Sequence, residues 1–234
     1  MHLSVIIPAY NEEKNLKNTI LKCLEYLNKQ KYLFEIIIVN DGSTDSTLQI
    51  AQKLSSKYNV IKIIDLKINQ GKGAAVKTGI LASLGGYSLF MDADYATSID
   101  NLDKAWVELK NCNVVIASRN PKDVIETKIE ISQSVWKQSL GKIGNFLTRA
   151  LTGLSFYDTQ CGFKIFTSTV AKKIFTELKT VGWAFDIEAL LLAQKYNYKI
   201  KAIPVIWKNA PDSRVGFKGY LTTLKELISI KINL

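Results

Sequence analysis

Two aspartates two residues apart, Asp92 and Asp94, directly follow the apolar segment 87–91. Carboxylates at this spacing can share a divalent cation, and such a cation acts as a Lewis acid on a departing diphosphate. An isolated Asp-x-Asp pair is more often an acidic turn after a strand. Here the pair lies among other polar residues that follow predicted strands, so we interpret Asp92-Ala93-Asp94 as a metal and diphosphate centre.

Four more side chains near predicted strand ends suit the recognition of a nucleotide. Asp41 can accept hydrogen bonds from a base or ribose, although an Asx turn explains it equally well. Tyr10 can stack on a base, and Glu12 can bind ribose or base or instead cap a helix. Lys72 lies between two glycines, where a flexible lysine can reach a phosphate or a base. These glycines lack the third glycine of a dinucleotide fingerprint, and no P-loop pattern occurs, which disfavours dehydrogenases and P-loop proteins.

The second half of the chain adds further candidates. Arg119 follows a predicted strand and can clamp a phosphate. Asp158 begins the polar cluster 158–164, which is either part of a site or a turn that uses glycine. Asp186 and Glu188 begin an apolar helix, where they either face the site or interact with the helix dipole. If the acceptor is a sugar hydroxyl, Asp158, Asp186 or Glu188 would be the candidate general base.

The scarcity of histidine and cysteine limits the metal chemistry. His2 is the only histidine, and Cys23, Cys112 and Cys161 show no CxxC spacing. This pattern argues against a histidine base, a disulfide framework and a zinc knuckle, and it fits a reducing cytosol. A metal in this protein would depend on oxygen ligands, which favours Mg²⁺ or Mn²⁺.

The apolar segments of the first half predict the framework that positions these groups. Strands are expected at 3–7, 34–39, 60–66, 87–91 and 113–117, with helices after Asn11 and at 45–57, 73–84 and 99–110. We expect Asn11 to cap the first helix, with Glu12 and Glu13 in its first turn, and Ser43 or Thr44 to cap the second. Alternating strands and helices predict an α/β fold with a mostly parallel, Rossmann-like sheet flanked by helices. Because ligands bind at the carboxyl ends of such strands, the polar residues should converge on one crevice.

The second half has a different pattern. Residues 119–135 are polar and irregular, and we expect them to form a loop. Helices are predicted at 136–152, 168–178, 184–196 and 218–233, and strands at 163–167 and 199–207. Pro204 within the last strand indicates an edge or a bulge.

Most of the net charge of +10 lies in the second half of the chain. Residues 119–234 hold 18 Lys and Arg against 9 Asp and Glu, a net charge of +9. Such a region fits a nucleic acid, a phosphorylated substrate or an anionic membrane, and a solvated lysine-rich surface is an equal alternative. The basic amphipathic helix 136–152 can lie on an anionic membrane or pack on the sheet. No apolar run of about 18 residues and no signal peptide are visible, so no transmembrane helix is expected.

Taken together, several stretches resemble the family 2 glycosyltransferases with the GT-A fold. The matching stretches are VIIPAYNEE, IIIVNDGSTDST, INQGKGAAVKTG, FMDADYATSID, ASR and DTQCGFKIF, and the resemblance runs from residue 3 to about 215. DADxATS, DTQCGFK and WAFDIE are most similar to the dolichyl-phosphate β-glucosyltransferases, with the dolichyl-phosphate mannose synthases as close relatives. Tyr95 departs from the small or polar residue that often follows DAD in these families.

The resemblance implies an inverting transfer of a hexose from UDP-glucose, or next GDP-mannose, to a polyprenyl or dolichyl phosphate, with Mg²⁺ or Mn²⁺. It implies a nucleotide-sugar site made of Pro8, Tyr10, Glu12, Asp41, Lys72, Asp92, Ala93, Asp94, Arg119 and Arg214. The expected catalytic residues are Asp92, Asp94, Arg119, Asp158, Gln160 and Asp186, with Asp92 and Asp94 on the metal. The acceptor phosphate is expected to meet Ser134, Lys137 and Arg214.

This interpretation divides one GT-A domain, residues 1–234, into three parts. These are a nucleotide-sugar-binding half (1–118), an acceptor half (119–217) and a basic C-terminal helix (218–234). We expect the protein at the cytoplasmic face of a membrane, bound peripherally. A phosphate monoester, with a second pKa of about 6, is already ionised near neutral pH and needs no strong base.

Three other functions remain open at this point. A family 2 transferase that acts on a glycan or polysaccharide would share the donor site. A non-catalytic protein that binds a nucleotide-sugar or docks on a membrane is disfavoured by the intact Asp92 and Asp94 pair. Nucleic-acid binding would explain the charge but not the polar residues at the strand ends.

Overall fold

A seven-stranded sheet forms the centre of the computed structural model, which describes residues 2–125, 127–129, 135–207 and 217–233. Its strands are β1 (Leu3–Ala9), β2 (Phe34–Asn40), β3 (Ile61–Asp65), β4 (Tyr87–Met91), β5 (Val114–Ser118), β7 (Phe163–Thr167) and β8 (Ile200–Pro204). The strand order is β3-β2-β1-β4-β7-β5-β8, and β7 alone among these strands runs antiparallel to its neighbours.

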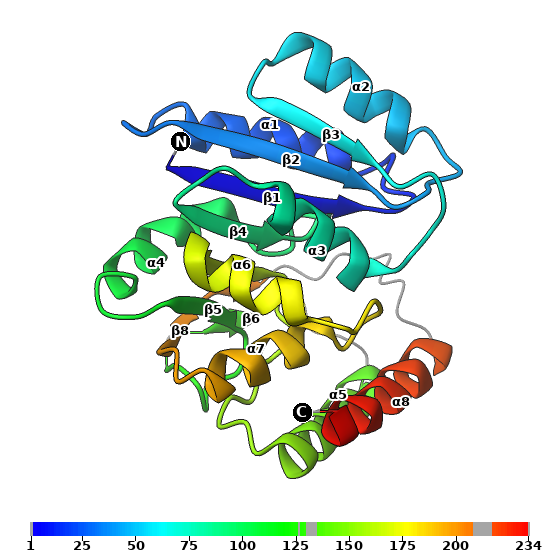
Figure 1. Cartoon of the computed structure of the whole chain (residues 1–234), viewed down its shortest axis with the longest axis vertical. Coiled ribbons are helices and arrows are strands. Elements are labelled where there is room, and N and C mark those ends of the chain that lie inside the picture. Colours follow the sequence, from blue (N-terminus) through cyan, green and yellow to red (C-terminus); the bar gives the residue numbers. More distant parts are fainter. Residues whose placement is uncertain (1, 126, 130–134, 208–216, 234) are drawn as a thin grey trace.

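Helices cover both faces of this sheet (Figure 1). They are α1 (Leu16–Leu27), α2 (Thr47–Lys57), α3 (Lys72–Ala82), α4 (Leu102–Glu108), α5 (Val135–Thr152), α6 (Ser168–Glu177), α7 (Phe185–Lys195) and α8 (Phe217–Asn233), with a 3-10 turn, η1 (Ile99–Asn101). Helices α1, α2 and α4 bury strand residues such as Val5 and Ile7, whereas α3, α6 and α7 bury Ile6 and Phe90 on the other face. Strands buried on both faces explain the nearly continuous apolar runs in the sequence.

Strand β7 lies between β4 and β5 and separates them. Because it runs antiparallel, the segment 158–162 that precedes it reaches the same sheet edge as the carboxyl ends of β4 and β5. The predicted α/β class with a mostly parallel sheet is confirmed. The position of β7 was not predicted, because a local apolar pattern does not specify which strands a segment pairs with.

The first helix begins later than predicted. Helix α1 starts at Leu16, and Asn11, with a φ of 55°, lies in the turn before it. Glu12 and Glu13 therefore precede the helix, so the predicted cap and acidic first turn are wrong. Asn11 Oδ1 instead accepts a hydrogen bond of 2.8 Å from the backbone N–H of Thr44. This bond joins two loops that lie at the carboxyl edge of the sheet.

The predicted cap of the second helix is also wrong. Helix α2 starts at Thr47, so Ser43 and Thr44 lie before the helix, where they make other contacts. The Ser43 hydroxyl accepts from the backbone N–H of Asn11 at 2.9 Å. Asp45 Oδ1 accepts from the Thr47 N–H at 3.0 Å and so satisfies an amide at the start of the helix. Since Asp, Ser and Thr are all good caps, the sequence alone did not distinguish them.

The predicted loop 119–135 contains a short strand. Strand β6 (Lys128–Ile129) pairs in parallel with β9 (Ile206–Trp207) as a separate two-stranded sheet. The segment predicted as one strand at 199–207 is therefore divided into β8 and β9. Strand β8 forms an edge of the main sheet, as Pro204 indicated.

Helices α5 and α8 lie side by side at one end of the molecule (Figure 1). Leu227 and Ile230 anchor α8 in the same apolar core as α6 and α7. Phe146 of α5 and Ile228 and Ile232 of α8 are exposed to solvent. Among the described residues, none of the helices is both long and apolar enough to span a membrane.

Two helix glycines give a test of how tightly α3 packs on the sheet. A Cβ at Gly79 would lie 2.5 Å from Ile6 Cγ2, whereas a Cβ at Gly144 in α5 would meet no atom within 4 Å. Both changes to alanine gain helix propensity of about 1 kcal/mol. Gly79→Ala also overpacks stiff β-branched neighbours, which costs about 1–3 kcal/mol. Chemical denaturation should show Gly144→Ala at least as stable as the wild type and Gly79→Ala less stable; equal stabilities would contradict this packing.

Candidate active site

The polar residues singled out in the sequence gather at the carboxyl edge of the parallel strands. Asp41 follows β2, Asp92 and Asp94 follow β4, and Arg119 follows β5. The antiparallel β7 brings the segment 158–162 to the same edge. The expected convergence therefore occurs, and the segment 158–162 that precedes β7 is an additional neighbour of Asp92.

Asp92 is held between a lysine and a glycine. Lys72 Nζ lies 2.6 Å from Asp92 Oδ1, and both side chains are largely buried. The Asp92 N–H donates to Gly162 O at 3.2 Å. A Cβ at Gly162 would overlap Asp92 Oδ2, so the approach of β7 to this carboxylate requires glycine. Gly162 was not among the residues predicted for the site, although it lies in the DTQCGFK stretch.

The surroundings of Asp94 disfavour its negative charge more than water would. Its Oδ1 accepts from the Ala96 N–H at 2.9 Å. Burial, followed by the negative charge of Asp92, raises the pKa of Asp94, while the Ala96 N–H and Lys72 oppose that rise. Between the two aspartates, Ala93 O accepts from the Thr19 hydroxyl at 2.6 Å. A cation shared by Asp92 and Asp94 would relieve their repulsion.

Lys72 is the cation nearest this pair. Burial disfavours its charge, but the carboxylates of Asp92, Asp186 and Asp94 outweigh that effect and raise its pKa. Its Nζ also lies 5.3 Å from the ring centroid of Trp183. Lys72 is therefore protonated and directed toward the Asp92 side of the site.

Asp41 shapes the loop that presents Lys72. Its Oδ1 accepts from the Gln70 N–H at 2.7 Å, and its Oδ2 accepts from the Gly71 N–H at 3.0 Å. Gly71, with a φ of 101°, directly precedes α3 as its N-cap residue. In this structure Asp41 therefore binds the protein backbone and holds the loop that leads into α3.

The β1 end of the site carries Pro8, Tyr10 and Glu12. Pro8 is buried within β1, and Tyr10 is 40% exposed just beyond its end. Glu12 Oε2 accepts from Asn15 Nδ2 at 2.8 Å. Tyr10 is therefore accessible to solvent at the carboxyl edge of the sheet.

Arg119 and Asp158 form a bidentate ion pair. Arg119 Nε and Nη2 lie 2.7 and 2.8 Å from the two carboxylate oxygens of Asp158, and the Arg119 backbone N–H also donates to Asp158 Oδ2 at 2.7 Å. Burial alone would raise the pKa of Asp158, but Arg119 lowers it below the ordinary range. Asp158 thus orients Arg119, and it is a poor proton acceptor near neutral pH.

A second buried pair lies behind the site. Lys164 Nζ is 2.7 Å from Asp186 Oδ1, and the two side chains are 1% and 4% exposed. Lys164 Nζ also donates to Cys161 O at 2.7 Å. Burial raises the pKa of Asp186, and the positive charges of Lys164 and Lys72 oppose that rise. Lys164 was not among the individual residues predicted for the site, although it ends the polar cluster 158–164 and lies in the DTQCGFK stretch.

The remaining candidates are held at the margin of the site or lie outside the described residues. Glu188 accepts from the backbone N–H groups of Lys179 and Thr180 at 2.9 and 2.6 Å, so it supports a loop. Gln160 is exposed, and its Nε2 donates to Trp183 O at 3.4 Å. The predicted acceptor residues Ser134 and Arg214 lie outside the described residues, as does the side chain of Lys137.

The protein side chains at this site can bind a divalent cation only together with ligands from another molecule. Within the residues described, no group of three or more His, Cys, Asp and Glu side chains comes together as a metal site. Mg²⁺ is usually bound by one or two carboxylates together with substrate phosphates and water. Asp92 and Asp94 supply those two carboxylates, so the site suits a metal that arrives with a phosphorylated ligand.

Comparison with known proteins identifies the class of this site. The family model described as "Glycosyl transferase family 2" matches residues 4–175. The chain is 36% identical over 245 residues to the dolichyl-phosphate β-glucosyltransferase of Drosophila melanogaster, covering 98% of this chain and 74% of that protein. It is 35% identical over 243 residues to the Homo sapiens protein of the same name, covering 98% and 75%. The resemblance expected from the sequence motifs is confirmed.

A solved structure shares the fold. Glucosyl-3-phosphoglycerate synthase from Mycobacterium tuberculosis, in complex with Mn²⁺, UDP-glucose and phosphoglyceric acid, superposes with a TM-score of 0.70. The sequences are 16% identical, and the match covers 98% of this chain and 79% of that one. The predicted GT-A fold is confirmed by this likeness.

The ion pair between Arg119 and Asp158 gives a stability prediction with a pH signature. Asp158→Asn leaves the guanidinium of Arg119 without its charged partner; because that side chain is 29% exposed, the cost should be less than the roughly 3–5 kcal/mol of a fully buried pair. The pKa of Asp158 is lowered in the folded state, so the contribution of this pair is complete above the ordinary carboxyl pKa of about 4 and falls as the pH drops below it. Denaturation at several pH values should show the largest difference in the free energy of unfolding between wild type and variant above about pH 4.

A control for that measurement is Glu25→Gln on α1, where an exposed pair with Lys29 contributes little. A difference for Asp158→Asn that is absent above pH 4, or that grows as the pH falls, would contradict the assignment of a depressed pKa.

Proposed function

The chain belongs to glycosyl transferase family 2 and is a glycosyltransferase, and on that basis we propose that it transfers glucose from UDP-glucose to a dolichyl or other polyprenyl phosphate. The three carboxylates predicted as candidate bases, Asp158, Asp186 and Glu188, each have a structural partner among the described residues, and this observation carries the choice of acceptor. The names of the relatives at 36% and 35% identity support the same choice.

Each candidate base has a structural partner. Asp158 is paired with Arg119 through both of its oxygens. Glu188 holds two backbone amides with its two oxygens. Asp186 has the raised pKa of a proton acceptor, but it is 4% exposed and Lys164 Nζ lies 2.7 Å from it. An acceptor that brings its own ionised oxygen therefore fits this site better than a hydroxyl acceptor.

A phosphate monoester meets this requirement. Its second pKa is about 6, so near neutral pH it is largely a dianion with a nucleophilic oxygen. The site then has to align that oxygen with the sugar and exclude water, which are contributions of position rather than of proton transfer. In-line attack from the face opposite the leaving diphosphate inverts the anomeric centre.

On the donor side, we assign the residues at the carboxyl edge to successive parts of the nucleotide-sugar. Pro8, Tyr10, Glu12 and Asp41 would surround the nucleoside. Lys72 and Arg119, both cationic and directed to this edge, would neutralise the diphosphate. Asp92 and Asp94 would hold Mg²⁺ or Mn²⁺, with Ala93 between them; the metal would supply Lewis-acid stabilisation of the departing diphosphate.

The acceptor half has the character of a membrane-facing surface. Phe146, Ile228 and Ile232 expose apolar side chains on the adjacent helices α5 and α8. Residues 119–234 carry a net charge of +9, which attracts anionic headgroups. We propose that this helix pair lies on the cytoplasmic face of a membrane and that Ser134, Lys137 and Arg214 would bind the phosphate of the lipid.

Transfer assays with Asp94→Ala test the donor and metal assignment. The protein is incubated with Mg²⁺ or Mn²⁺, polyprenyl phosphate, and either UDP-glucose or GDP-mannose. Transfer should occur with UDP-glucose, and Asp94→Ala should lower its rate by about 10²–10³-fold, because the developing diphosphate charge loses its stabilisation. Glu25→Ala, which removes an exposed carboxylate on α1, is the control and should be as active as the wild type.

Transfer from GDP-mannose but not from UDP-glucose would show that the donor assignment is wrong. Full activity of Asp94→Ala would overturn the metal assignment, and failure of both donors to support transfer to the lipid would overturn the acceptor assignment.

Gly162→Ala tests whether β7 sets the position of Asp92. The added Cβ would push on Asp92 Oδ2, and a displacement near 1 Å can reduce a rate by about 10²-fold. Gly86→Ala is the matched change, since its Cβ would meet no atom closer than 3.6 Å. Steady-state assays should show a strong loss of kcat for Gly162→Ala with unchanged circular dichroism, and equal activity of the two variants would count against this geometry.

A further inference from the structure

We propose that Glu226 of helix α8 is a positioning residue for the donor site. It acts through the loop 178–184, which connects α6 to α7 and extends toward α8 (Figure 1). The inference rests on the proposed function, because it assigns Glu226 a role in nucleotide binding.

Glu226 supplies the cap that helix α7 lacks. The residue at the N-cap of α7 is Ala184, whose side chain has no acceptor. Glu226 Oε2 accepts from the Ala184 N–H at 2.9 Å. A Cβ at Gly182 would overlap Glu226 Oε1, so the loop approaches this carboxylate as closely as glycine allows. A carboxylate at a helix N-terminus is stabilised by the helix dipole, so the contact is favourable as well as close.

The loop that Glu226 holds also completes the start of helix α3. Gly182 O and Val181 O accept from the N–H groups of Gly73 and Ala74 at 3.2 and 3.1 Å. These are amides of the first turn of α3, directly after Lys72. The position of the loop therefore fixes the start of the helix that carries Lys72.

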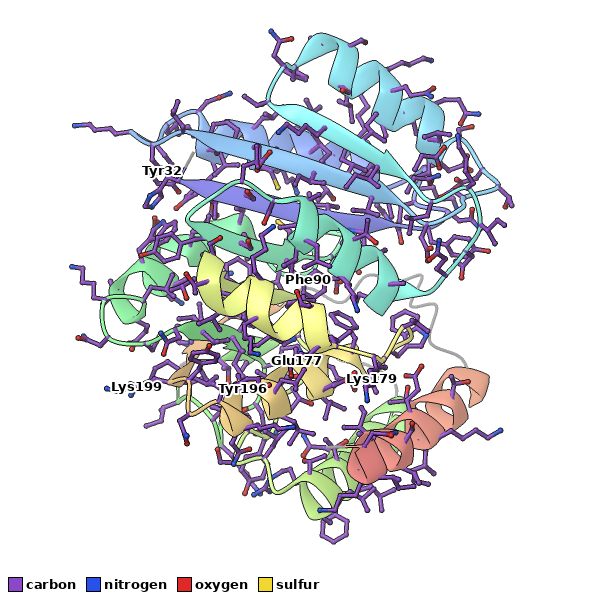
Figure 2. All side chains as sticks on the ribbon, viewed as in Figure 1. Tyr32, Phe90, Glu177, Lys179, Tyr196 and Lys199 are labelled. Carbon is purple, nitrogen blue, oxygen red and sulfur yellow. The ribbon has the colours of Figure 1, made fainter. Side chains whose placement is uncertain are left out.

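Trp183 gives the loop a second contact with Lys72. The Trp183 ring centroid lies 5.3 Å from Lys72 Nζ, within the range of a cation–π interaction. Lys72 Nζ also lies 5.3 Å from the ring centroid of Phe90, a β4 residue that Figure 2 labels. Lys72 is thus within cation–π range of two aromatic rings while it pairs with Asp92.

These contacts form a continuous connection from α8 to the Asp92 carboxylate. Its members are Glu226, the backbone of Gly182 to Ala184, Trp183, Lys72 and Asp92. Glu188 holds the opposite end of the loop through the N–H groups of Thr180 and of Lys179, which is labelled in Figure 2. Loss of Glu226 would free the half of the loop that faces Lys72 and leave the other half in place.

The test measures nucleotide binding in solution, without lipid, so that changes in membrane contact have no effect. UDP and GDP are titrated with Mn²⁺ into wild type, Glu226→Ala, Glu226→Gln and Lys225→Ala. We expect Glu226→Ala to weaken the binding of UDP by about tenfold, the size expected for one charge-assisted hydrogen bond. Glu226→Gln keeps an acceptor oxygen and should recover part of the affinity, and Lys225→Ala, an exposed neighbour on α8, should bind like the wild type.

Hydrogen exchange of the loop amides is measured on the same variants. The Ala184 N–H should exchange faster in Glu226→Ala, while the Lys179 and Thr180 N–H groups, held by Glu188, should change little. Unchanged affinity together with unchanged Ala184 exchange would overturn the inference, as would faster exchange without any loss of affinity. If the wild type binds neither nucleotide, the proposed function fails, and the exchange of Ala184 alone then decides whether Glu226 positions the loop.

Discussion

The site depends on the pairing of opposite charges, partly or fully buried, at one edge of the sheet. Lys72 with Asp92, Arg119 with Asp158 and Lys164 with Asp186 lie at or just behind the carboxyl ends of the strands, and each pair is joined at 2.6 or 2.7 Å. A buried charge without a partner is strongly destabilising, so each pair fixes the geometry of the elements that carry it.

Strand β7 is what brings these charges together. Its antiparallel insertion places Gly162 against Asp92, Lys164 against Asp186, and Asp158 within reach of Arg119. The same arrangement commits the carboxylates that could otherwise act as general bases. A fold built this way retains two cations, Lys72 and Arg119, at this edge, which supports the proposal of a diphosphate donor and of an acceptor that is already ionised.

The sequence predicted the strands of the main sheet, its largely parallel framework and the polar residues at the strand ends, because these follow from apolar periodicity and from the direction of parallel strands. It did not predict the small β6–β9 sheet or the partners of those polar residues. Asp158 was considered as a base and is bound to Arg119, and Asn11 was considered as a cap and bridges two loops. Glu226 and Gly162 gave no local signal of their roles, since both act on residues far away in the chain. Contacts of this kind arise from strand order and helix docking, which a local pattern does not specify.

The central claim is that the acceptor supplies its own nucleophile as an ionised phosphate. The most direct measurement compares a polyprenyl phosphate with the polyprenol of equal length, in identical detergent with UDP-glucose and Mn²⁺, and identifies the products by mass spectrometry. Our account predicts a glucosyl phosphodiester from the phosphate and no glucoside from the alcohol, because the carboxylates that could deprotonate a hydroxyl are bound elsewhere. Comparable transfer to the alcohol would contradict it.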